Sequence, residues 1–121
     1  MIQGLRTVIY KVEDLEKAKL WYANVLGFEP YFDQPFYVGF NVGGFELGLD
    51  PDSKDVTTGN NVLAYWGVEN IEKTFEKLLE LEAEIDSGVT EVGEGIKVAT
   101  VKDPFGNIFG IIENPHFEIK D

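Results

Sequence analysis

The stretch GGFELGLDP, residues 43–51, places one acid, Glu46, inside a short apolar run that follows two glycines. A carboxylate that leaves water is costly unless a cation, a metal ion or hydrogen-bond donors meet it. As a general base, Glu46 could remove a proton next to a carbonyl group, with Tyr37, Tyr65 or Lys11 as the proton donor. Glu46 is the only catalytic candidate, and without a metal ion to stabilise an enolate the barrier would stay large.

Other common catalytic chemistries lack their residues. The chain has no cysteine, so the sequence excludes disulfides, thiolate nucleophiles and thiolate metal sites. The only histidine, His116, lies in the tail NPHFEIKD, where we expect a surface residue rather than a ligand, and nucleophilic catalysis of the Ser-His-Asp kind has no second base available. The stretch GVTEVGEG, residues 88–95, has glycines but no Lys-Ser/Thr pair, so it does not form a phosphate-binding loop.

Length and charge limit the class of protein. The 121 residues fit one domain, and 22 acids against 10 bases give a net charge of −12. This charge argues against a nucleic-acid partner; it favours cationic ligands or simply keeps the protein soluble. No apolar run approaches the roughly 20 residues that span a bilayer. The start, MIQGLRTVIY, does not resemble a signal peptide, so we expect no membrane partner and a cytoplasmic location.

The chain contains an internal repeat. Residues 7–17, TVIYKVEDLEK, match residues 63–73, LAYWGVENIEK, as an alternating strand that runs into a helix. A second echo relates FELGLDP (45–51) to FGIIENP (109–115) through their Phe and Pro residues. The sequence therefore predicts an α+β fold of two β-α-β-β-β modules in a single domain, 1–121, with module 1 at about 3–50, a linker at about 51–60 and module 2 at about 61–115.

Helices and strands follow from spacing and turn residues. Apolar residues recur at helical spacing over 15–26, where Gly27 ends the helix, and again over 71–79. Asp14 and Asn70 are the predicted N-caps. Each helix precedes three predicted strands: FEPYF, FYVGFNV and FELGLD in module 1, and EIDSGV, IKVATVK and NIFGIIE in module 2. The last two strands of each module are joined by a glycine turn or by DPFG.

The register of the first hairpin can be predicted from its turn at residues 43–44. Asn41 then lies opposite Glu46 and Gly39 opposite Gly48, and one face of the hairpin becomes wholly apolar. Residues on that face must pack on a helix: Val38, Phe40, Val42, Phe45, Leu47 and Leu49.

The opposite faces of the two modules are predicted to line a ligand-binding cup. Its predicted residues are Thr7, Ile9, Tyr37, Asn41, Glu46, Leu63, Tyr65 and Gly110. Glycines at positions 39, 48, 67 and 110 would leave this cup roomy, because strand-interior glycines often mark the close approach of a ligand. The alternative is that this face meets a dimer partner.

An aromatic cluster lies beside the predicted cup, in and after the second strand. Tyr31, Phe32, Phe36 and Tyr37 are placed for stacking on a flat ligand. The alternative is that Phe32 and Phe36 belong to the core.

The segments VEDLEKAKLWYANVLGFEP, VENIEKTFEKLLELEAE and VKDPFGNIFGIIE give the chain a family resemblance. It resembles the glyoxalase / bleomycin-resistance / extradiol-dioxygenase superfamily, also called vicinal oxygen chelate proteins. This resemblance implies curved mixed sheets around a cup, usually completed in a homodimer. It does not identify a reaction, because the superfamily includes lyases, isomerases, epimerases, dioxygenases, thiol transferases and non-catalytic drug binders.

The resemblance also implies where metal ligands would lie. The first-strand positions correspond to Thr7 and Leu63, and the fourth-strand positions to Glu46 and Gly110. Only Glu46 is one of the His, Gln or Glu residues that metal-dependent members use there. Because zinc, nickel or iron needs three or four donors, we expect no functional metal and no cofactor.

We therefore expect a metal-independent small-molecule-binding protein that takes a cationic or aromatic compound in a dimeric cup, as bleomycin-resistance-type members do. Two alternatives stay open. The first is a glyoxalase-class lyase or isomerase, similar to lactoylglutathione lyase, that uses Glu46 as base or ligand. The second is a non-catalytic regulatory or interaction module.

Overall fold

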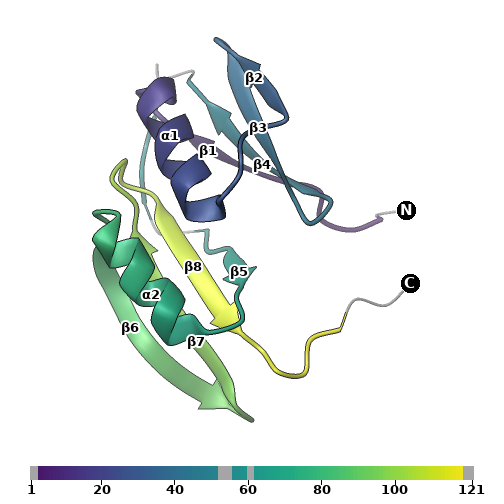
Figure 1. The fold of residues 1–121 in the computed structure, drawn as a ribbon, viewed down its shortest axis with the longest axis vertical. Helices are drawn as coiled ribbons and strands as arrows, with labels where there is room; N and C mark the ends of the chain where they lie inside the picture. The colour runs from purple at the N-terminus through teal and green to yellow at the C-terminus, as the bar shows by residue number, and fades with distance from the viewer. Residues whose placement is uncertain (1–2, 52–55, 60–61, 119–121) are drawn as a thin grey trace. The chain divides into compact units, whose positions relative to one another are not determined.

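The computed structural model describes residues 3–51, 56–59 and 62–118 (Figure 1). Within these residues a β-α-β-β-β order occurs twice, as predicted. The fold is α+β, with two four-stranded mixed sheets and a helix in each half, and this confirms the predicted fold class. The chain divides into two compact units, residues 1–57 and 58–121, and each is described by itself. The assembly of the two sheets around a shared cup stays a prediction.

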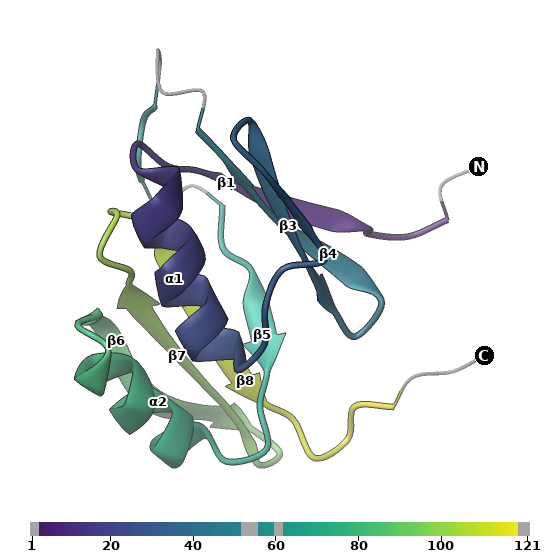
Figure 2. The same cartoon turned by 45° about the horizontal axis from the view of Figure 1, so that its top comes forward.

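The first unit contains a sheet with the order β1-β4-β3-β2. Strand β1 (Thr7–Lys11) lies parallel to β4 (Phe45–Asp50). Strand β3 (Tyr37–Val42) pairs antiparallel with both β4 and β2 (Phe32–Gln34). Figure 2 shows β1, β4 and β3 side by side, with α1 (Leu15–Leu26) in the same unit.

The predicted register of the first hairpin is correct. Asn41 pairs with Glu46 and Gly39 with Gly48, so the side chains separate onto two faces as expected. Helix α1 contacts β3 and β4, and the apolar face is buried along most of its length at Val38, Phe40, Leu47 and Leu49. At the hairpin tip, Phe45 is exposed, which differs from the prediction that the whole face is packed.

Helix α1 begins and ends where the sequence indicates. The side chain of Asp14 accepts a hydrogen bond from the backbone N–H of Lys17, which satisfies one of the free donors of the first turn. Gly27 ends the helix in the left-handed conformation at φ 84°, which a residue without a Cβ adopts easily.

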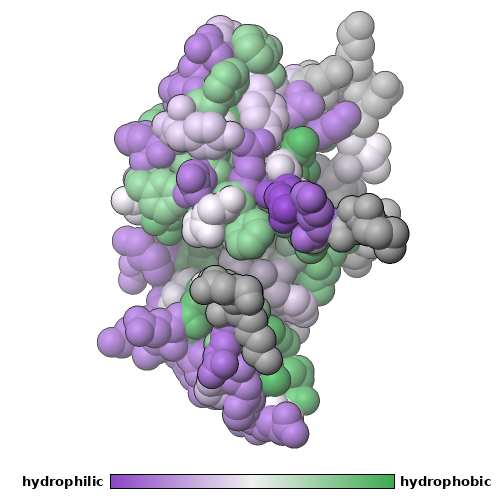
Figure 3. Space-filling view, turned by 90° about the vertical axis from the view of Figure 1, so that its right-hand side faces the viewer, coloured by the Kyte–Doolittle hydropathy of each residue, from purple (hydrophilic) through white to green (hydrophobic). Residues whose placement is uncertain are grey.

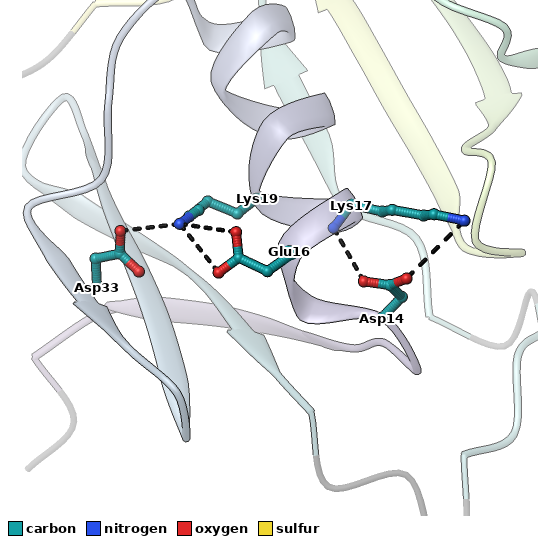
Figure 4. A network of polar contacts seen from close by, with 5 residues as sticks. All are labelled: Asp14, Glu16, Lys17, Lys19 and Asp33. Carbon is teal, nitrogen blue, oxygen red and sulfur yellow. Dashed lines mark hydrogen bonds and ion pairs between the residues drawn. The ribbon is translucent and has the colours of Figure 1, made fainter.

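A polar network ties α1 to the edge strand β2 (Figure 4). The ammonium group of Lys19 on α1 lies 3.1 Å from a carboxylate oxygen of Asp33 on β2 and 3.2 Å from one of Glu16. Hydrogen bonds to Asp33 and Glu16 raise the pKa of Lys19 above its ordinary value, so this group stays charged at neutral pH. The link fixes a strand that is only three residues long.

The second unit repeats the plan with the order β5-β8-β7-β6. Strand β5 (Tyr65–Gly67) lies parallel to β8 (Ile108–Glu113). Strand β7 (Ile96–Lys102) pairs antiparallel with both β8 and β6 (Glu84–Gly93). Helix α2 (Ile71–Glu80) lies along one face of this sheet, in contact with β6, β7 and β8 (Figures 1 and 2).

Two predicted strands differ from the structure by several residues. The segment FEPYF was expected to be a strand, but β2 begins at Phe32, because Pro30 has no N–H to donate to a sheet. The N–H of Tyr31 makes the first bond in this region, to the carbonyl of Gly39. Strand β6 continues to Gly93, beyond the predicted EIDSGV, with several shifts in its register against β7.

The surface of the described chain mixes hydrophilic and hydrophobic residues, as one face shows in Figure 3. None of the helices in the described ranges is both long enough and apolar enough to cross a membrane.

We predict that Asn70→Ala destabilises the protein by about 1 kcal/mol, because the Asn70 side chain caps the first turn of α2 by accepting a hydrogen bond from the N–H of Lys73. Urea unfolding followed by circular dichroism measures this loss. Asn70→Asp is the matched control, since aspartate caps equally well. Equal stability of Asn70→Ala and wild type would contradict the assigned cap.

Candidate functional site

Glu46 meets two tyrosine hydroxyl groups on the polar face of the first sheet. The Tyr31 hydroxyl donates to Oε1 of Glu46, and the Tyr37 hydroxyl donates to Oε2 at 2.5 Å. Glu46 lies on β4, Tyr37 on β3 and Tyr31 just before β2, so three adjacent chain segments supply these side chains. The Glu46 carboxylate and its two tyrosine hydroxyls are here called the carboxylate cluster. The half-buried carboxylate is therefore compensated by neutral donors rather than by a basic side chain.

Two glycines make room for the carboxylate cluster. A Cβ atom at Gly48 would lie 1.9 Å from the Tyr37 hydroxyl oxygen, and one at Gly39 would lie 3.0 Å from Oε1 of Glu46. The paired glycines were expected to leave space for a ligand. In the structure this space is filled by Tyr37 and Glu46, because the phenol ring can reach the carboxylate only by lying across a strand position that lacks a side chain.

The aromatic cluster expected around the second strand is present. The ring of Phe32 lies 6.0 Å from that of Phe36 and 6.1 Å from that of Tyr37, centroid to centroid. Phe36, Tyr31 and Phe32 are all exposed, at 66%, 64% and 36%, so the alternative that Phe32 and Phe36 belong to the core is wrong. Exposed rings thus surround an anchored carboxylate.

The carboxylate cluster keeps both phenols protonated. Burial, followed by the hydrogen bond to Glu46, raises the pKa of Tyr37 well above its ordinary value. The hydrogen bond to Glu46 is the main cause that raises the pKa of Tyr31. Both tyrosines are therefore hydrogen-bond donors at neutral pH and remain so into alkaline solution.

The other predicted residues of the first unit share this face. Thr7 is the β1 partner of Glu46, and Ile9 is the β1 partner of Gly48. Oδ1 of Asn41 accepts a hydrogen bond from the N–H of Gly44 at 2.8 Å, so this side chain supports the hairpin turn. The structure thus brings Thr7, Ile9, Tyr37, Asn41 and Glu46 onto one sheet face.

Leu63, Tyr65 and Gly110 come together separately, on the second sheet. Tyr65 pairs with Gly110, and a Cβ at Gly110 would lie 2.8 Å from the Tyr65 ring and 3.2 Å from the Leu63 side chain. Leu63 and Tyr65 line a hollow of about 260 Å³ that also includes Asp86, whose carboxylate accepts a 2.7 Å hydrogen bond from Thr100. Whether the two groups of residues face one another stays a prediction.

The structure corrects the equivalence drawn between Glu46 and Gly110. Thr7 pairs with Glu46 and Ile9 with Gly48 in the first sheet, whereas Tyr65 pairs with Gly110 in the second. In the internal repeat, Tyr65 corresponds to Ile9. Their strand partners, Gly110 and Gly48, therefore correspond to each other, and the counterpart of Glu46 is Ile108. The Phe and Pro residues shared by FELGLDP and FGIIENP suggested an alignment that is shifted by two residues from the observed one. The shift arises because residues 103–107 make the second turn longer than the Gly43-Gly44 turn.

The residues around Glu46 do not fit a transition-metal site. Its neighbours are two tyrosines, Thr7 and Asn41, and the matching positions of the second sheet are Leu63 and Ile108. Across the described ranges, no three His, Cys, Asp or Glu side chains form a group that could hold a metal. The donor set therefore supports no metal-dependent step.

His116 is exposed, as expected. One of its ring nitrogens, Nε2, lies 2.8 Å from the carbonyl oxygen of Glu94 in the β6–β7 turn. This contact fastens the chain that follows β8 to its own sheet.

The sequence interpretation missed the part that Tyr31 takes. Tyr31 was assigned to ring stacking, and its hydroxyl was not paired with Glu46. A signal was available: two donors are needed for a half-buried carboxylate, and the glycine pair at 39 and 48 leaves room for two rings.

We predict that Glu46→Ala lowers the pKa of Tyr31 toward about 10, since it removes the main cause of the shift. Tyr37 should move less, because burial remains. Ultraviolet titration of the five tyrosines measures both changes, with Tyr31→Phe and Tyr37→Phe to assign them.

The sign of the stability effect follows from the raised pKa values. The neutral phenols stabilise the wild type below pH about 10, and this contribution disappears as the pH rises through their folded-state pKa values. Glu46→Ala should lose less stability over that range. Identical tyrosine titration curves for Glu46→Ala and wild type would contradict the hydrogen bonds of the carboxylate cluster. Glu91→Ala on β6 is the control and should titrate like wild type.

Comparisons with known proteins agree with this architecture. A model of the Glyoxalase/Bleomycin resistance protein/Dioxygenase superfamily matches residues 4–111. No match was found among curated proteins.

Among solved structures, a glyoxalase-related enzyme from Fulvimarina pelagi is similar at 22% identity and TM-score 0.80, over 98% of this chain and 94% of that one. The genomically encoded fosfomycin resistance protein FosX from Listeria monocytogenes is similar at 15% identity and TM-score 0.79, over 96% and 97%. Lactoylglutathione lyase from Agrobacterium tumefaciens is similar at 20% identity and TM-score 0.72, over 96% and 98%. At these identities the solved structures share the fold alone, whereas the family model covers most of the chain, and the chain therefore belongs to the glyoxalase/bleomycin resistance protein/dioxygenase superfamily.

Proposed function

We propose that this protein binds a small organic cation with aromatic character, without a metal ion, on the polar face of its first sheet. The observation that carries the proposal is the carboxylate of Glu46, which two tyrosine hydroxyls hold in place among exposed rings. The charge of the site is negative, and its walls are aromatic.

The bound carboxylate keeps capacity for a ligand. Each oxygen of Glu46 accepts one phenolic hydrogen bond, whereas a carboxylate has room for about four. A cationic nitrogen can therefore approach without displacing Tyr31 or Tyr37. Because Glu46 is half-buried, its attraction for a cation is screened less than that of a fully exposed acid.

The rings supply the second part of the recognition. A cation over the face of a tyrosine or phenylalanine ring gains about 0.5–2 kcal/mol, depending on how far it is desolvated. Phe32 and Phe36 extend the aromatic surface next to Tyr37, and offset or edge-on stacking suits a flat ligand there. The net charge of −12 would add a long-range attraction for cations.

The enzymatic alternative has less support. The name of the lyase among the similar structures carries no argument about activity, because the identity of 20% shows only the fold. Proton abstraction by Glu46 next to a carbonyl would also need a group that stabilises the enolate. Thr7 and Asn41, the two residues that pair with Glu46, do not supply a strong Lewis acid.

We predict that Glu46→Gln weakens the binding of benzyltrimethylammonium about tenfold, as expected for the loss of one partly screened ion pair. Titration followed by the ring signals of the tyrosines in NMR spectra measures the dissociation constant. Benzyl alcohol should bind equally weakly to both proteins, because it has the ring without the charge.

Glu91→Gln on β6 is the matched control, since it removes one negative charge from an exposed strand outside the carboxylate cluster. Equal affinity of wild type and Glu46→Gln for benzyltrimethylammonium would refute a cation site at Glu46.

The metal-free part of the proposal has its own test. We expect the melting temperature to be the same with and without EDTA, because the residues around Glu46 lack a donor set for a transition metal. Elemental analysis of untagged protein should find no stoichiometric zinc, nickel or iron. A stoichiometric metal together with a melting temperature lowered by EDTA would overturn this part.

A further inference from the structure

The second unit contains a larger hollow next to the chain that follows β8. Its volume is about 560 Å³, within the range of small-molecule sites, roughly 300–1,000 Å³. Strand β5 and the residues after it supply Tyr65, Gly67, Val68 and Glu69, and the chain after β8 supplies Asn114 and Phe117. Of these residues, Tyr65 belongs to the predicted ligand-binding residues and Gly67 to the glycines predicted to leave the cup roomy.

We propose that this hollow, here called the tail pocket, binds a flat apolar molecule that carries a cationic nitrogen. This is a second site, built from other residues than the carboxylate cluster of the first sheet. It therefore goes beyond the proposed function and does not depend on it.

The sheet gives the tail pocket an apolar floor. Gly67 pairs with Ile112, and no described residue other than the chain neighbours of Gly67 has an atom within 4 Å of the position that a Cβ there would occupy. At Gly48 the equivalent space is filled by the Tyr37 ring, and at Gly110 by the carbonyl oxygen of Ala64 and the Tyr65 ring. The open space over Gly67 is bordered by Val68 and Ile112, which suits a flat hydrocarbon surface.

The chain after β8 is fastened in a way that holds Phe117 at the pocket. The side chain of Asn114 accepts a hydrogen bond from the N–H of His116 at 2.9 Å, and its carbonyl accepts one from the N–H of Phe117 at 3.2 Å. The His116 ring contacts the carbonyl oxygen of Glu94 at 2.8 Å. A tight turn and a contact to the β6–β7 turn thus present Phe117.

Phe117 and Tyr65 are the aromatic walls. Phe117 is 71% exposed and Tyr65 is 42% exposed although both line the pocket. Exposed rings gain free energy when an apolar ligand covers them. The walls therefore favour a ring system as the ligand.

The charge of the tail pocket selects a cation. Among the described residues that line it, Glu69 is the only charged one. A carboxylate at the border of an apolar hollow attracts a positive group and repels an anion of the same shape. The negative net charge of the chain acts in the same direction.

The test uses two dyes of nearly the same shape, 9-aminoacridine, which is a cation at neutral pH, and acridine, which is neutral there. Fluorescence titration of the full chain measures their affinities. We expect Phe117→Ala to weaken both dyes about tenfold, through the lost ring contact. We expect Glu69→Gln to weaken 9-aminoacridine about fivefold and to leave acridine unchanged.

Matched controls separate this pocket from general effects. Phe45→Ala removes another exposed ring, and Glu76→Gln removes another exposed acid, on α2. Both should bind like wild type, and circular dichroism checks that each variant folds. If Phe117→Ala does not fold, the affinities of Glu69→Gln for 9-aminoacridine and acridine decide whether the tail pocket binds the cation.

The possible results distinguish the two sites. Weaker binding in Phe117→Ala and Glu69→Gln but not in Glu46→Gln supports the tail pocket, whatever happens at the first sheet. Weaker binding only in Glu46→Gln overturns the tail pocket and leaves the proposed function standing. Unchanged affinity in Phe117→Ala and Glu69→Gln, or no saturable binding of either dye to wild type, also overturns it.

Discussion

The structure of the first unit depends on how one carboxylate is compensated. Within the described ranges no basic side chain pairs with Glu46 on β4, and the two phenols of Tyr31 and Tyr37 provide its hydrogen bonds. This arrangement needs the glycine pair Gly39 and Gly48, because any side chain there would occupy the space of a ring or of the carboxylate. A single chemical requirement thus explains an acid, two tyrosines and two glycines on three neighbouring segments.

Two sets of contacts hold the short strand β2 in place, one on each face of the sheet. Tyr31 reaches Glu46 only if the chain before β2 lies against β3, and its N–H bond to Gly39 secures that position. On the opposite face, Lys19 binds Asp33 of β2, and Figure 4 shows this contact together with Glu16. Since Lys19 and Asp33 are partly exposed, this pair contributes through geometry more than through a large electrostatic energy.

Much of the fold could be predicted because it follows local rules. Alternation along the hairpin from Tyr37 to Asp50 set its register, and the polar residues Asp14 and Asn70 marked both helix starts correctly. The site was harder. Its residues on the first sheet could be named from alternation alone, but the bond from Tyr31 depends on a side-chain direction across strands, which sequence spacing does not give. The predicted equivalence of Glu46 with Gly110 was wrong because a Phe and a Pro shared by the two segments do not determine how a strand pairs when its turn differs in length.

The corrected register shows that the two repeats have become chemically different. The row that holds Glu46 and Asn41 in the first sheet has Ile108 and Lys102 in the second. Gly39 leaves space for the carboxylate cluster in the first sheet. The matching position of the second sheet is Thr100, whose hydroxyl donates a hydrogen bond to Asp86. The first sheet therefore presents a carboxylate held by two phenols, whereas two hollows of the second unit are lined by Tyr65 and aliphatic residues, with Asp86 in one and Glu69 in the other. Two copies of one fold unit thus present chemically unlike faces, although their strand order and pairing directions are the same.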